Sequence, residues 1–287
     1  MSDEPVQSSG EGGEGGEEPT MLEAFIEQVM TLVVAIAIAL MVRQVLIEPF
    51  RIPSGSMFPT LLVGDHLFVN KISYGPRVPF TDFRLPGLRE PERGDIVVFE
   101  IARPARPGMR DIMPVDQAPP GSHTEDFVKR VVGLPGDVVA WSPGRLSVND
   151  EPVALTAAGI WTDDRGQAHV RGTEDLGACR HSVLHNPAIR NRIAVQSTLP
   201  PSGVVKVPQG RYFMMGDNRD GSNDSRAWGT VRFEEMKGPA FMLYWSWAHE
   251  GNMLAFFNPL VWFTAEKRWD RVFQGLDCDP VPGVTSG

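Results

Sequence analysis

The sequence predicts an all-β domain of packed or coiled sheets that follows a single N-terminal transmembrane helix. One long apolar segment stands near the N-terminus, and from Phe50 onward short β-rich runs are separated by Gly and Pro. The chain has 287 residues, of which 42% are hydrophobic, and this is enough to bury a sizeable core. Its net charge of -9 gives no general attraction to nucleic acid, so none is expected as a partner.

Residues 1–20 form an acidic, Gly-rich segment without Lys or Arg. Such a composition cannot bury a core, and a disordered tail is expected. Residues 21–48 are the predicted transmembrane anchor, with an uncharged centre from Val29 to Val42. About 20 residues are needed to cross a bilayer, so the polar residues at the ends of this centre must lie at an interface. Residues 252–265 are too short and too interrupted for a second span, and one span is expected.

Two other interpretations of the apolar segment are a buried core helix and a cleaved export signal. No basic residue precedes the segment, and no small-x-small cleavage site lies between Pro49 and Pro53, which argues against a signal. The length favours an uncleaved anchor. Arg43 and Arg51 follow the span and no Lys or Arg precedes it, which by the positive-inside rule favours a cytoplasmic C-terminal part.

The β-rich runs predict strands at residues 65–72, 95–101, 126–133, 137–142, 145–150, 203–208, 211–217 and 240–247. Residues 102–125 are rich in Pro and Arg and are expected to form a loop, and residues 151–200 are expected to form an inserted subdomain. The β-rich domain then comprises residues 49–150 and 201–250. Residues 251–287 are assigned to a C-terminal segment.

Residues 52–60, IPSGSMFPT, contain a candidate nucleophile. Ser54 and Ser56 flank Gly55, which permits a turn that presents both hydroxyls, while prolines stiffen both sides. A hydroxyl is a weak nucleophile until a base within hydrogen-bond reach accepts its proton. The stretch contains no histidine, so the base must come from elsewhere in the chain.

The histidines are poor candidates for that base. His66 lies in an alternating run, where a structural strand histidine is expected. His181, His185 and Cys179 have a spacing that could hold zinc on a helix, but the segment lacks helical periodicity and a fourth ligand. Neither a metal nor an organic cofactor is expected. Cys179 and Cys278 could alternatively form a single disulfide, which the sequence leaves open.

Lys129 offers another route, because a buried amine without a countercharge has a lowered pKa and can act as a base near neutral pH. Phe127, Lys129 and Val131 share one face of the predicted strand, which places the amine among apolar neighbours. The alternative is an edge-strand lysine that points into solvent. Spacing alone favours that alternative, because most lysines are exposed.

Three segments together resemble the ordered motifs of bacterial type I signal peptidases, the membrane-anchored Ser-Lys proteases that remove signal peptides. They are PSGSMFPTLLVGD, DFVKRVVGLPGD and MMGDNRDGSNDSRAWG, in that order and behind an apolar segment. The resemblance extends from Phe25 to Trp245, and KRWDRVF near the end is similar to the closing segment of many members. It implies a signal-peptidase-like coiled antiparallel β-sheet.

The resemblance implies a role for each matching residue. Ser56 matches the nucleophile and Lys129 the general base, while Ser54 and the backbone N–H of Ser56 form the oxyanion hole. Ser222 matches a serine that hydrogen-bonds the lysine amine.

The residues implied to support the site are Gly55, Arg130, Asp217, Asp224 and Arg226, and Asp224 is expected to pair with Arg226 beside Arg130. The residues implied to line the substrate pockets are Ile52, Pro53, Met57, Leu61, Asp126, Phe127 and Val128. Phe58 and Phe127 depart from the commoner aliphatic and tyrosine residues of the family, which alters the pocket shapes.

The implied partners are the lipid bilayer and the signal peptides of exported preproteins, which carry small residues one and three positions before the cut. The implied location is the bacterial cytoplasmic (inner) membrane with the catalytic domain on the extracytoplasmic side, and this overrides the Arg count. A self-cleaving Ser-Lys repressor would carry a DNA-binding helix-turn-helix in place of the anchor, and none is found. A tethered β domain that only binds partners would leave Lys129 as a surface amine.

Overall fold

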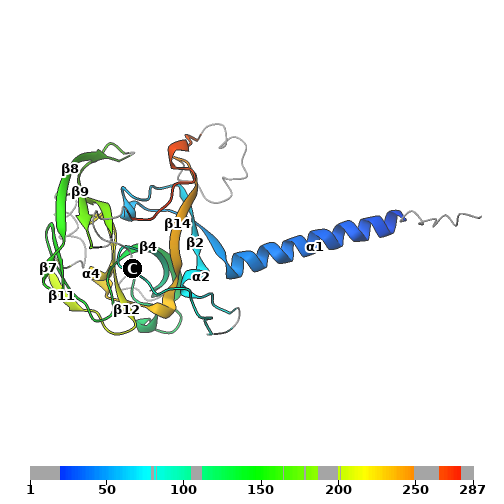
Figure 1. Ribbon diagram of the computed structural model, residues 1–287, viewed down its shortest axis with the longest axis horizontal. Helices are drawn as coiled ribbons and strands as arrows, with labels where there is room; N and C mark the ends of the chain where they lie inside the picture. The colour runs from blue at the N-terminus through cyan, green and yellow to red at the C-terminus, as the bar shows by residue number, and fades with distance from the viewer. Residues whose placement is uncertain are drawn as a thin grey trace, which may run out of the picture. The chain divides into compact units, whose positions relative to one another are not determined.

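The computed structural model describes residues 20–78, 81, 83–104, 112–163, 165–177, 179–186, 200, 202–248 and 265–278 (Figure 1). The chain divides between Val42 and Arg43 into two compact units. The predicted N-terminal tail, apart from Thr20, and most of the apolar run at residues 252–265 lie outside the described residues.

Helix α1 (Met21–Val45) makes up the N-terminal unit and continues past its boundary. Its 25 residues rise about 37 Å, which is enough to cross the hydrocarbon layer of a bilayer. Among the described residues it is the one helix long and apolar enough to span a membrane, and the chain buries none of its most apolar window.

The largest sheet has seven strands, and each neighbouring pair is antiparallel. Its order is β1 (Ile47–Arg51), β2 (Asp65–Asn70), β14 (Met236–Ser246), β3 (Ile96–Arg103), β4 (His123–Gly133), β12 (Arg211–Met215) and β13 (Val231–Arg232). The register shifts at three places along β14, and such bulges increase twist and allow a sheet to coil. The predicted all-β fold is confirmed.

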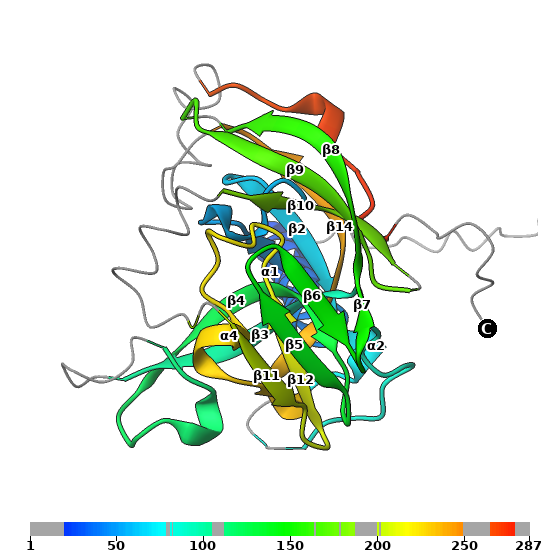
Figure 2. The same cartoon turned by 90° about the vertical axis from the view of Figure 1, so that its left-hand side faces the viewer.

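Two smaller antiparallel sheets lie beside each other in Figure 2. The first has the order β11 (Gly203–Lys206), β5 (Val138–Ser142), β6 (Arg145–Val148) and β7 (Glu151–Pro152). The second has the order β10 (Arg180–His185), β9 (Ala168–Asp175) and β8 (Ala154–Thr162), and it falls within the predicted insertion. Almost every residue of β8 is exposed, and its sequence ALTAAGIWT lacks the strict alternation of apolar and polar residues that marks a half-buried strand.

The remaining elements are short helices. They are α2 (Lys71–Tyr74), α4 (Ser225–Trp228) and 3-10 helices at Gly55–Met57, Val115–Gln117, Phe233–Glu235 and Trp269–Arg271. Every strand that the sequence predicts overlaps a strand of the structure. The expected loop at residues 102–125 is shorter than predicted, because β3 runs to Arg103 and β4 begins at His123.

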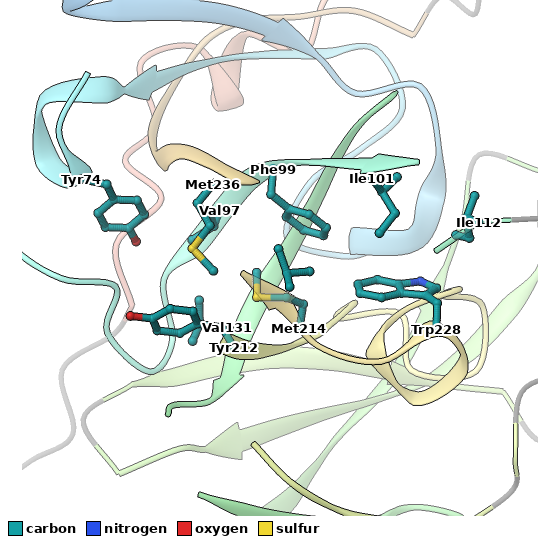
Figure 3. Close-up of a cluster of buried hydrophobic side chains, with 11 residues drawn as sticks. Tyr74, Val97, Phe99, Ile101, Ile112, Val131, Tyr212, Met214, Trp228 and Met236 are labelled. Carbon is teal, nitrogen blue, oxygen red and sulfur yellow. The ribbon is translucent and has the colours of Figure 1, made fainter. Parts of the chain in front are cut away.

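Strand β3 separates two hydrophobic cores. Val97, Phe99 and Ile101 point into the first, where β4, β12 and α4 contribute Val131, Met214 and Trp228 (Figure 3). Ile96 and Val98, which alternate with them, point into the second core. That second core also holds Ile52, Met57 and Leu61. The segment around Ser56 is therefore held on both sides by buried apolar side chains.

Candidate active site

Ser56 lies in the 3-10 helix that follows β1. Its neighbour Met57 and the nearby Leu61 are both fully buried, so packing fixes the loop that carries the hydroxyl. A Cβ added at Gly55 would lie 2.5 Å from the ring of Phe58, so a larger residue there requires that ring to move. The Ser54 hydroxyl donates to Ser56 Oγ at 3.5 Å, so both hydroxyls face the same space.

Lys129 reaches Ser56 from strand β4. Its Nζ lies 2.8 Å from Ser56 Oγ, and it also donates to the carbonyl oxygen of Val128 at 2.8 Å. The Lys129 side chain is only 3% exposed, and its Nζ lies 5.2 Å from the centre of the Phe127 ring. The solvent-facing edge lysine that spacing alone favoured is therefore wrong, and the apolar surroundings expected from strand alternation are present.

Burial lowers the pKa of Lys129 from its ordinary value to about 8. The cause is desolvation, which disfavours the ammonium form, while the charges of Asp224 and Asp217 act in the opposite direction. A useful fraction of the amine is therefore neutral near physiological pH. In that form its lone pair can accept the proton of the Ser56 hydroxyl.

Asp224 pairs with Arg226, as the sequence analysis expected. Their closest charged atoms are 2.7 Å apart, and Asp224 also accepts a hydrogen bond from the backbone N–H of Gly216 at 3.1 Å. Burial raises the pKa of Asp224, but Arg226, the Gly216 N–H and the charge of Lys129 together outweigh this, and the pKa is lowered overall. The carboxylate is therefore charged, and its attraction for the ammonium form is the largest influence opposing the desolvation of Lys129.

Arg130 does not join that pair but forms its own with Asp217. Arg130 Nε and one terminal nitrogen donate to the two carboxylate oxygens at 2.8 and 2.7 Å, and both residues are buried. Asp217 also accepts a hydrogen bond from the Thr60 hydroxyl at 2.6 Å. Because Thr60 follows the loop that carries Ser56 and Arg130 follows Lys129, the pair connects the segments that carry Ser56 and Lys129, which are called the dyad below.

Cys179 and Cys278 form a disulfide, which the sequence left open. Its sulfur atoms lie within 4.0 Å of the Arg130 guanidinium. Cys179 is therefore no zinc ligand, and His181 instead lies beside the buried charges with Nε2 3.7 Å from Asp217. Burial and the nearby arginines hold the pKa of His181 well below its usual value. Within the described ranges, no group of three or more His, Cys, Asp or Glu side chains could hold a metal ion.

Ser222 is placed next to the dyad but does not make the expected bond. Its side chain is buried, and within the described part of the chain its Oγ has no hydrogen-bond partner. A Cβ added to Gly216 would lie 2.2 Å from Ser222 Oγ and 2.4 Å from the carbonyl oxygen of Ser56. The absence of a side chain at Gly216 therefore allows Ser222 to approach Ser56. The Ser222 hydroxyl lies beside Ser56 and is not used in another hydrogen bond within the described residues.

A cleft of about 600 Å³ contains the dyad. The predicted pocket residues that line it are Ile52, Pro53, Asp126, Phe127 and Val128, together with Ser54, Gly55, Ser56 and Lys129. Met57 and Leu61 belong to the second core and do not line it. Strand β12 pairs with β4 only from Arg130 onward, so within the described residues one edge of Asp126–Lys129 has no strand partner.

Several residues at the site were not singled out from the sequence. Asn218 donates from its backbone N–H to the Ser56 carbonyl at 3.1 Å and from its side chain to the Gly55 carbonyl at 3.0 Å. Arg271 binds Asp65 at 2.6 Å and the Thr60 carbonyl at 2.8 Å. Asn218 lies inside a motif that the sequence analysis quoted. The Arg271–Asp65 pair spans 206 residues, and no local pattern predicts it.

Comparisons with known proteins agree with the motifs. The family profile described as signal peptidase, peptidase S26, matches residues 25–245. Signal peptidase I of Pseudomonas fluorescens is 41% identical over 221 residues, which is 73% of this chain and 69% of the relative. Signal peptidase I of Pseudomonas aeruginosa is 37% identical over 257 residues, or 84% and 81% of the two chains. A crystal structure of a signal peptidase I from Enterococcus faecalis V583 aligns with a TM-score of 0.28 at 20% identity, over 52% of this chain and 96% of that one. The family match and the two sequence relatives show that the chain belongs to the signal peptidase family, peptidase S26, and is a serine endopeptidase.

Proposed function

We propose that this protein removes N-terminal signal peptides from exported preproteins, with Ser56 as nucleophile and Lys129 as general base. The observation that carries the proposal is the contact between a buried amine and a hydroxyl, at 2.8 Å between Nζ and Oγ. The lowered pKa of Lys129 supports the same assignment, because a general base works best when its pKa lies near the working pH.

The reaction is acyl transfer in two stages. The neutral amine of Lys129 accepts the hydroxyl proton while Ser56 Oγ bonds to the scissile carbonyl carbon. The resulting ammonium then gives that proton to the leaving nitrogen as the carbon–nitrogen bond breaks, which leaves an ester on Ser56. Lys129 next takes a proton from a water molecule that attacks the ester, and the proton returns to Ser56 Oγ as the ester breaks. Both peptide products are released and the enzyme is regenerated.

An oxyanion hole for the tetrahedral intermediates is available at the same loop. The Ser54 hydroxyl faces Ser56 Oγ at 3.5 Å, and Ser56 stands in the first turn of a 3-10 helix, whose N–H groups have no partner within the helix. We assign both donors to the developing oxyanion. Removing one such donor commonly lowers kcat by about 10² to 10³.

The free edge of Asp126–Lys129 suits an extended substrate, which would add as a strand. Ile52, Pro53 and Val128 give the cleft an apolar wall beside Ser56. A wall so close to the nucleophile leaves room for small side chains, and we propose that cleavage follows small-x-small sites. Phe127 lines the same cleft, and its ring centre lies 5.2 Å from Lys129 Nζ.

Ser222 is proposed as the residue that positions the Lys129 amine. Its Oγ is buried and without a partner within the described residues, and a hydroxyl can orient the amine without adding a charge that would raise its pKa. The pairs Arg130–Asp217 and Asp224–Arg226 support the site by fixing the segments around it. These charges are already paired, which limits their effect on the titration of Lys129.

The apolar helix α1 is consistent with a membrane anchor. We propose the bacterial inner membrane, with the catalytic part on the extracytoplasmic side, because exported proteins are cut there. The chain from Ile47 to Ser56 can extend at most about 30 Å, which keeps the nucleophile near the membrane surface. The lipid bilayer and the signal peptides of preproteins are the corresponding partners.

The assignment of the dyad is tested with a preprotein that carries Ala-x-Ala before the cut. Ser56→Ala and Lys129→Ala should each abolish its cleavage by the purified full chain. Ser142→Ala and Lys206→Ala change the same residue types at exposed strand positions and should cleave normally. Undiminished cleavage by either dyad variant would remove this mechanism.

The orientation is tested separately by adding protease to intact spheroplasts. Digestion of the part after Phe50 is expected, because an extracytoplasmic domain is accessible from outside. Full protection would instead place that part in the cytoplasm, as the count of Arg residues suggests.

A further inference from the structure

The hairpin of β8 and β9 contributes to the candidate cleft. Asp163, Gln167 and His169 line the same 600 Å³ space as Ser56 and Lys129. Aromatic contacts fix the hairpin there: the Trp161 ring lies 5.2 Å from the ring of Phe58, in the nucleophile loop, and 5.7 Å from the ring of His169. A segment far from the dyad in sequence is thus one wall of its cleft.

Polar groups on this wall are buried without a hydrogen bond. His169 is 3% exposed, and neither of its ring nitrogens has a hydrogen-bond partner within the described residues. Its Nε2 lies 3.5 Å from Asp163 Oδ2. Asn218 Oδ1, which belongs to another cleft residue, is likewise buried and without a partner there. Buried polar groups are normally satisfied, so these atoms are suited to bind a ligand.

The path of a bound substrate leads toward this wall. If the residues before the cut pair with Asp126–Val128, the scissile bond lies at Lys129 and Ser56. Beyond that point the edge of β4 is occupied, because Arg130 and Val131 pair with β12. The chain after the cut cannot continue along the strand and must turn into the cleft. The residues before the cut already occupy the apolar side of the cleft. The residues after the cut must therefore contact the polar wall that holds Gln167 and His169.

We propose that His169, Gln167 and Asn218 form a subsite that binds the first two residues after the cut and prefers carboxamide side chains there. The inference rests on the proposed function. A carboxamide both donates and accepts, so its NH₂ can bond Asn218 Oδ1 while its oxygen accepts from a ring N–H of His169. An apolar side chain of similar size would leave both groups unpaired, and sites built for hydrogen bonds reject such analogues.

The test uses one preprotein with the same Ala-x-Ala site and either Gln or Leu at both positions after the cut. The purified full chain should cleave the Gln form with a kcat/KM roughly tenfold higher. Equal kcat/KM values for the two forms would overturn the subsite. If the protein cleaved neither form, the proposed function itself would fail, so the two failures are distinguishable.

Two variants test whether Gln167 and His169 cause the preference for Gln over Leu after the cut. His169→Phe keeps a ring against Trp161 and removes both nitrogens, so the Gln/Leu ratio should fall toward one while the melting temperature does not decrease. Gln167→Ala should also lower the ratio, by a smaller factor. Thr156→Ala, at an exposed position of β8, is the matched control and should keep the ratio. A ratio that stays tenfold in both cleft variants would overturn the assignment.

Discussion

The Nζ atom of Lys129 lies 2.8 Å from Oγ of Ser56, although 73 residues separate them in the chain. Strand β4 carries the lysine into a buried position, and the second core holds the loop of the serine. Neither group depends on solvent for its placement. The short distance is therefore a product of packing, and it places the hydroxyl and the amine within hydrogen-bond reach of each other.

The activity should rise with pH. The pKa of Lys129 is lowered to about 8, so the amine is mostly protonated at pH 7 and mostly neutral at pH 9. Cleavage of the Ala-x-Ala preprotein should reach half of its plateau near pH 8, as measured by kcat/KM against pH. A flat profile, or one that falls over this range, would contradict a neutral amine as the base.

The variant Asp224→Asn should move that rise to lower pH. The Asp224 carboxylate raises the pKa of Lys129 and desolvation lowers it. Removing the carboxylate should therefore lower the pKa of Lys129 further. The measurement is the same profile, with thermal unfolding as a check that the variant folds. Asp175→Asn, a partly exposed residue that pairs with Arg180, is the control and should leave the midpoint unchanged. A midpoint that moves upward in Asp224→Asn would contradict this electrostatic account.

The buried amine of Lys129 should cost stability at neutral pH. Its folded pKa of about 8 lies below the ordinary value of 10.5, so burial opposes folding fully below pH 8, and the penalty disappears as pH rises past 10.5. Lys129→Met should therefore lose activity yet gain at most about 3 kcal/mol in free energy of unfolding at pH 7. Denaturant unfolding in detergent at pH 7 and at high pH measures the gain. If Lys129→Met lowered the free energy of unfolding more at pH 7 than at high pH, the buried amine would stabilise the folded protein, and this prediction would be wrong.

The buried pair Arg130–Asp217 should be much more important for stability than an exposed pair. Arg130→Gln leaves Asp217, which is 0% exposed, without its main countercharge, and such removals cost about 3 to 5 kcal/mol. Arg180→Gln removes a pair whose side chains are 40% and 28% exposed, and it should cost less than about 1 kcal/mol. Unfolding of both variants by denaturant gives the comparison. Equal costs would mean that the buried pair contributes no more than a surface one.

Gly216→Ala should impair catalysis. The added Cβ would lie within 2.4 Å of the Ser56 carbonyl oxygen and of Ser222 Oγ, so the nucleophile loop must shift. A misplacement of about 1 Å can cost about 10² in rate, and kcat should fall by that order. Gly275→Ala is the control, because its nearest neighbour would be an Asp277 oxygen at 3.8 Å. Full activity in Gly216→Ala would show that the loop tolerates this displacement.

The sequence by itself determined the long apolar helix, most strands of the large sheet and the order of the three motifs. Each of these depends on residues close together in the chain: a continuous apolar run for α1, and alternating apolar residues for strands such as β3 and β4. Ser56 and Lys129 were singled out through the resemblance of their segments to family motifs, because spacing alone favoured an exposed lysine. The strands β8 to β10 were not predicted, and in β8 the sequence ALTAAGIWT lacks strict alternation of apolar and polar residues.

Only the tertiary structure decided which distant residues meet. It joined Cys179 to Cys278, paired Arg130 with Asp217, buried Lys129 where spacing alone favoured solvent, and left Ser222 Oγ without the expected bond. The physical reason is that local sequence sets which face of a strand a residue occupies, whereas its partners and its exposure to water depend on how the sheets coil and pack against one another.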